Sequence, residues 1–85
     1  MIPIKFSDKK QQITDAIQAK LRVTPIIGEN GFTIVEGFIM QPISSEVSGN
    51  MIIGGPTIPL VAIVGNTSGR MYYFALKALL PDINI

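Results

Sequence analysis

Residues 65–70 read GNTSGR and follow an apolar run, which is where a phosphate-binding loop would stand if the chain had one. Such a loop needs four residues between its glycines, then Lys and then Ser or Thr, because backbone amides cradle the phosphates while the lysine and the hydroxyl complete the site. Here three residues separate Gly65 from Gly69, and Arg70 and Met71 follow. The dinucleotide fingerprint GxGxxG is absent as well. The spacing therefore predicts a turn between two strands, and we expect no cofactor.

The chain lacks the residues that most often perform nucleophilic catalysis. It contains no His and no Cys, so neither a Ser-His nor a Cys-His pair can form. Glu36 stands among apolar neighbours, a setting in which a carboxyl group can serve as a general acid. A carboxylate on the rim of the sheet, or one paired with Lys or Arg, explains the same position, and we favour that interpretation. The remaining oxygen ligands suit hard cations at best. We therefore expect neither an enzyme nor a metal site.

Basic side chains concentrate near the N-terminus. Residues 1–22 hold five basic and two acidic residues (net +3), and residues 23–85 hold two basic and four acidic residues (net −2), which sum to the +1 of the chain. The candidate contacts for phosphate or another anion are Lys9, Lys10, Lys20 and Arg22. Specific nucleic-acid binders are usually strongly basic, whereas the isoelectric point here is about 8.1. A nucleic-acid-binding module is therefore the alternative function and not the favoured one.

The composition instead indicates association between protein chains. Hydrophobic residues make up 47% of the 85 residues and charged residues only 15%, against a typical charged share of about 25%. A small domain has little interior, so some apolar side chains must lie on the surface, where apolar patches mark interaction sites. We expect a homodimer, with another protein as the alternative partner. The candidate interface residues are Phe38, Met40, Ile53, Tyr72 and Phe74.

The most apolar run, residues 51–64, is too short for a membrane span. It has 14 residues with two prolines and two glycines, whereas a spanning helix needs about 20 mostly apolar residues. The first ten residues lack the charged-then-apolar order of a secretory signal. A chain without cysteine also suits a reducing compartment. We expect a soluble cytoplasmic protein without membrane contact, and a single domain over 1–85 because no linker or internal repeat divides it.

The N-terminal quarter predicts a strand followed by a helix. Residues 2–6 alternate apolar and other side chains, which is typical of a short strand. From Ser7, a candidate helix cap, the apolar residues fall at spacings of three and four. They are Ile13, Ala16, Ile17 and Leu21. The helix should end before Pro25, because the residue that precedes a proline avoids helical angles.

Strands and turns should follow the helix. Residues 23–27 are a short candidate strand, and Asn30–Gly31 is a typical hairpin pair. Residues 32–43 form the next candidate strand, in which Glu36 interrupts the apolar face. Either the strand bulges at Glu36–Gly37 or Glu36 lies on a rim.

The C-terminal half predicts a hairpin. Residues 51–53 are a candidate short strand, and residues 58–64 form an apolar strand. After the turn at 66–69, we expect a strand to about Phe74 and then a helical turn that Pro81 stops; a helix over 71–80 is the alternative. The predicted class is α+β: an N-terminal amphipathic helix on an antiparallel sheet of four to five strands, open or curled into a partial barrel, with a short C-terminal helical turn.

Overall fold

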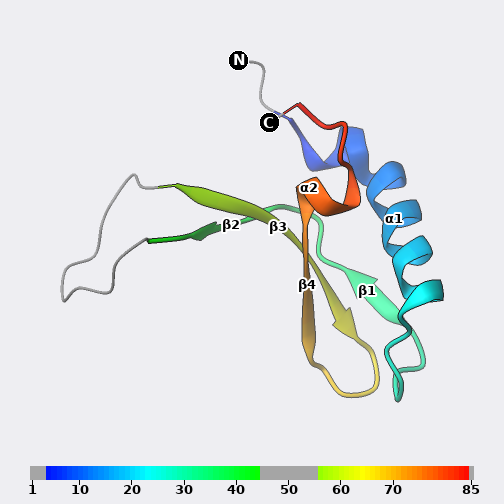
Figure 1. Ribbon diagram of the computed structural model, residues 1–85. Coiled ribbons are helices and arrows are strands. Elements are labelled where there is room, and N and C mark those ends of the chain that lie inside the picture. Colours follow the sequence, from blue (N-terminus) through cyan, green and yellow to red (C-terminus); the bar gives the residue numbers. More distant parts are fainter. Residues whose placement is uncertain (1–3, 45–55, 85) are drawn as a thin grey trace.

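The computed structural model describes residues 4–44 and 56–84, and these residues form the expected α+β fold (Figure 1). In chain order the elements are α1 (Phe6–Val23), β1 (Phe32–Ile34), β2 (Ile39–Pro42), β3 (Thr57–Gly65), β4 (Met71–Ala75) and α2 (Leu76–Leu79). The four strands make one antiparallel sheet, and α1 lies along one of its faces. The sheet is open, so the partial barrel does not form.

The strand β3 is the centre of the sheet. The hairpin partner β4 pairs along one edge of β3, with Ile63 opposite Tyr72 and Val61 opposite Phe74. Both β1 and β2 pair along the other edge, β1 beside the C-terminal end of β3 and β2 beside its N-terminal end. Every strand pairing among the described residues therefore includes β3.

The expected interruption at Glu36–Gly37 divides one long strand into β1 and β2. Ile34 pairs with Ile63, and Ile39 pairs with Leu60. Residues 35–38 thus stand opposite only residues 61–62, an excess of two residues that the chain accommodates as an irregular bend. Because the excess is an even number, the in-and-out alternation of side chains continues across the bend.

The core lies between α1 and the sheet. Ile13 and Ile17 from the predicted helical stripe are buried against Val61 and Ile63 of β3. The short α2 closes the same side of the sheet, since its Leu76 and Leu79 belong to the same buried cluster. This placement of α2 also confirms the predicted helical turn before Pro81; the alternative helix over 71–80 is wrong, because Met71–Ala75 is a strand.

The N-terminal strand prediction is wrong for the described residues. Helix α1 already begins at Phe6, and Lys5 rather than Ser7 is its N-cap, without a side-chain capping bond. The physical reason is tertiary: from the first helical turn, the Phe6 ring reaches the core and packs edge-to-face on Phe38, with 5.4 Å between ring centroids. Burial of that aromatic ring outweighs the short alternating pattern.

The predicted strand at 23–27 is also absent. Val23 is the last residue of α1, and residues 24–31 form a connection to β1 whose positive φ lies at Gly28 (99°). No hairpin forms at Asn30–Gly31, since a helix and not a strand precedes the turn. Ile27 is 93% exposed, so this segment finds no apolar surface to pair against. The expected strand at 51–53 lies outside the described residues.

Replacement of the central core isoleucine tests this packing. We expect Ile13→Ala to lower the free energy of unfolding by about 2–4 kcal/mol, because it leaves a cavity where the side chain is fully buried. The matched change Ile27→Ala removes the same atoms from an exposed position and should change the free energy by less than about 0.5 kcal/mol. Urea unfolding at one fixed protein concentration measures both, and equal losses would contradict the assigned core.

Candidate interaction surface

The sheet face opposite α1 lies outside the core cluster, and we call it the uncovered face. On β3, Val61 and Ile63 point toward α1, so the alternate residues point to the other side. Their cross-strand partners share that side. The main apolar residues on the uncovered face are Ile39, Ile58, Leu60, Val64, Met71 and Tyr73. Within residues 4–44 and 56–84, no helix lies on this face (Figure 1).

Exposure on the uncovered face is greatest on β4. Tyr73 is 53% exposed and Met71 is 44% exposed, and Ile58 at the far end of β3 is also exposed. The Tyr73 hydroxyl donates a hydrogen bond to the Met71 sulfur at 3.7 Å, so these two side chains lie together as one patch. None of the residues that the four strands direct to this face is charged. The surface therefore suits contact with another apolar surface.

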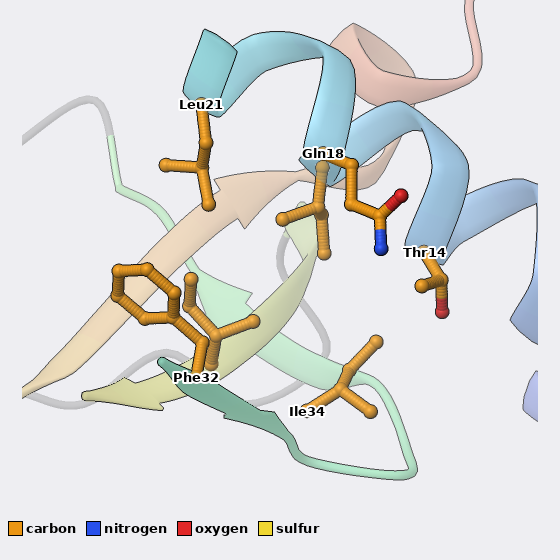
Figure 2. A pocket seen from close by; sticks show the side chains of 7 residues that line it. Thr14, Gln18, Leu21, Phe32 and Ile34 are labelled. Atoms are coloured by element: carbon orange, nitrogen blue, oxygen red, sulfur yellow. The ribbon is translucent and has the colours of Figure 1, made fainter. Parts of the chain in front are cut away.

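A groove between α1 and β1 is the second candidate. Figure 2 shows Leu21 and Phe32 at one end of it, and Thr14 and Ile34 at the other. Its volume is about 240 Å³, and its lining is apolar apart from the uncharged side chains of Thr14 and Gln18. Sites for drug-sized ligands usually exceed about 300 Å³. This groove has room for one apolar side chain or a small neutral molecule, and it carries no group that could perform acid–base chemistry.

The loop at 66–69 binds a carboxylate of its own chain. Glu29 accepts hydrogen bonds from the Ser68 N–H and the Ser68 hydroxyl, both at 2.9 Å. Beside it, the Asn30 N–H donates to the Thr67 hydroxyl oxygen at 3.0 Å. These bonds tie the α1–β1 connection to the β3–β4 turn. The glycine-flanked stretch that resembles an anion site in sequence thus acts as a structural clamp.

Glu36 lies on the rim, as the favoured interpretation expected. Its carboxylate forms an ion pair with Lys10 at 2.7 Å, and both side chains are at least half exposed. An exposed ion pair of this kind is worth at most about 1 kcal/mol. The pair joins α1 to the bend between β1 and β2 and gives Glu36 no enclosed pocket in which to act as an acid.

The four candidate phosphate contacts do not gather on one surface. Lys10 is engaged by Glu36. At about 100° per residue, Lys9 and Lys20 fall on one flank of α1, whereas Arg22 lies about 120° around the helix from Lys10. This scattered arrangement favours nucleic-acid binding less than a continuous basic stripe would.

The candidate interface residues occupy three kinds of position. Phe38, Tyr72 and Phe74 are half-buried against the core, and the Tyr72 ring packs edge-to-face on Phe32 at 6.1 Å. Met40 on β2 is exposed. Ile53 lies outside the described residues. Sequence reasoning missed Met71 and Tyr73 as surface residues.

The alternation of side chains along a strand already placed Tyr72 and Tyr73 on opposite faces. It left open which of the two faces the helix covers. In the structure α1 covers the face that carries Tyr72 and Phe74, so Met71 and Tyr73 are the exposed pair.

Comparisons with known protein families, with curated proteins and with solved structures find no match. Among the residues that the structure describes, no group of three or more acidic, His or Cys side chains could hold a metal ion. In the same ranges no helix is both long and apolar enough to cross a bilayer. The geometry of the chain itself is therefore the basis for a functional proposal.

A glycine substitution tests the clamp between the two loops. The Glu29 carboxylate occupies the place where a Cβ on residue 65 would lie. We expect Gly65→Ala to lower the free energy of unfolding by about 1–2 kcal/mol, because the added Cβ displaces the Glu29 carboxylate and breaks its hydrogen bonds to Ser68. In a Glu29→Ala background the same substitution should cost much less.

Gly37→Ala is the matched control, because a Cβ there meets no atom within 4 Å. The natural protein, Gly65→Ala, Glu29→Ala and the double variant form a double-mutant cycle. Thermal and urea unfolding of these four proteins give the coupling free energy between positions 29 and 65. A coupling of zero would contradict the clamp.

Proposed function

We propose that this protein works by associating with a second copy of itself through β4 and the uncovered face beside it. The observation that carries the proposal is the patch of Met71 and Tyr73, both substantially exposed on a sheet face that no helix of the described residues covers. Tyr and Met are enriched at protein interfaces, and a tyrosine offers an apolar ring with a polar tip to a partner.

The layered construction of domains supports the same proposal. A sheet with one apolar face becomes stable when a single layer covers it, as α1 does here. This sheet has apolar side chains on both faces, because β3 carries Leu60 and Val64 on the side that α1 does not cover. Exposed apolar side chains gathered on one face indicate a site of protein contact. A second protein surface would supply the missing layer.

The proposed role is non-enzymatic. The Glu36 carboxylate is exposed and ion-paired, and the groove beside α1 is lined by neutral side chains. We further place the protein in the cytoplasm, since a chain without cysteine needs no oxidising compartment. The dimer is the proposed working form, and its uncovered surface beyond β4 is available to a further protein partner.

A dilution series with one surface substitution tests the proposal. Light scattering should give about twice the 9.2 kDa chain mass at high concentration and the chain mass on dilution. Tyr73→Thr keeps a good strand former but removes the aromatic ring. We expect it to raise the dimer Kd at least about tenfold, or about 1.4 kcal/mol.

Ile27→Thr is the control for that experiment. It makes polar an apolar residue that is even more exposed than Tyr73 and lies outside the uncovered face, and it should leave the Kd unchanged. A monomer at every concentration would overturn the proposal, and equal effects of the two substitutions would show that the contact is not specific to β4.

A further inference from the structure

Within the described ranges, β4 pairs with β3 along one edge, and its other edge is free of strand partners. The Gly65 N–H donates to the Arg70 carbonyl at 2.8 Å. Bonded pairs alternate along an antiparallel ladder, so the next ones are Ile63 with Tyr72 and Val61 with Phe74. The N–H and C=O groups of the intervening residues, Met71 and Tyr73, therefore point away from β3. No other strand pairs with β4 in the described part of the chain.

The opposite edge of the sheet differs in ways that oppose pairing. There the edge is broken between β1 and β2, where Glu36 adds a charge. The Ile43 N–H donates to the Pro56 carbonyl, so by the same alternation Pro42 turns its nitrogen outward and has no N–H to offer. Breaks, charges and prolines are the usual protections of an edge strand. Residues 71–75 read MYYFA and contain none of them.

We propose that the free edge of β4 pairs antiparallel with β4 of a second copy, about a two-fold axis at Tyr73. The proposal rests on the self-association proposed above and specifies its contact. Outward-facing groups belong to residues 71, 73 and 75, and only one register uses all three: Tyr73 opposite Tyr73, and Met71 opposite Ala75. The two sheets then become one continuous sheet.

The side chains fit a two-fold contact. Such an axis sets the same patch of each copy against itself, so a charged edge would place like charges side by side. The edge of β4 is uncharged, and Arg70 of each copy lies outside the paired stretch. The two Tyr73 rings become neighbours on the uncovered face, where aromatic cross-strand pairs are favourable. A second copy of this chain is therefore the occupant that this edge fits.

Two substitutions at one position separate backbone pairing from side-chain contact. Met71→Pro removes an N–H that points outward, so it costs no bond to β3. We expect it to raise the dimer Kd at least a hundredfold. Met71→Thr removes the same side chain but keeps the N–H, and should change the Kd less than about tenfold. NMR amide spectra, in which the α1 and β3 resonances should match those of the unsubstituted protein, check that both variants are folded.

A single cysteine gives a second test that does not depend on proline being tolerated. The chain contains no Cys, so a disulfide in Tyr73→Cys can only join two copies. In the proposed register the two Cα atoms lie about 5.5 Å apart, inside the range of about 4.4–6.8 Å that a disulfide spans. Sheets stacked face to face would lie about 10 Å apart instead. We expect rapid crosslinking of Tyr73→Cys under mild oxidation, and none of Gln41→Cys on β2.

The outcomes separate this inference from the function on which it rests. Dimers in which Tyr73→Cys stays uncrosslinked and Met71→Pro associates normally would overturn the edge pairing but leave self-association intact. In that case Ile58→Thr, at the other end of the uncovered face, should weaken the dimer, whereas edge pairing predicts that it has no effect. If the unsubstituted protein is monomeric at every concentration, both the edge pairing and the self-association are overturned.

Discussion

The hydrogen bonding of the sheet depends on one strand, because β1, β2 and β4 all pair with β3 and with no other strand among the described residues. This arrangement constrains the sequence of β3 strongly. Its residues must avoid charge on both faces, since one face meets α1 and the other stays apolar. Proline is tolerated in β3 only where no ladder hydrogen bond is lost. Pro59 and Met40 are a non-hydrogen-bonded pair of the β2–β3 ladder, so the Pro59 nitrogen faces away from β2. On its other side Pro59 lies beyond the end of β4.

A central strand with three partners leaves the sheet with two edges of different character. The edge formed by β1 and β2 is broken into two short strands, while β4 is continuous and uncharged. The exposed pair Met71 and Tyr73 stands beside that continuous edge. Among the described residues, backbone groups without a strand partner and exposed apolar side chains thus occur on the same strand. This coincidence is the physical basis for proposing an association surface on β4 rather than in the groove beside α1, whose size suits only a small occupant.

The parts of the fold that local patterns control could be predicted from the sequence. The stripe containing Ile13 and Ile17 predicted α1, and the polar turn before Arg70 predicted the β3–β4 hairpin. Phe6 was misassigned because its burial depends on Phe38, which is remote in sequence. The Glu29–Ser68 clamp joins residues 39 positions apart and has no local signal. The exposed role of Tyr73 was missed for a related reason: alternation separates it from Tyr72 but cannot say which face the helix will cover.

Amide hydrogen exchange of Met71 and Tyr73, followed by NMR across a concentration series, is the most direct test of pairing between two β4 strands. Both N–H groups point away from β3, so in the monomer they should exchange as quickly as unpaired amides, whereas Tyr72 and Phe74 are held by the ladder. If β4 pairs with β4 of a second copy, protection at residues 71 and 73 should rise with protein concentration in parallel with the dimer population. Fast exchange at both residues while the protein is fully dimeric would contradict it.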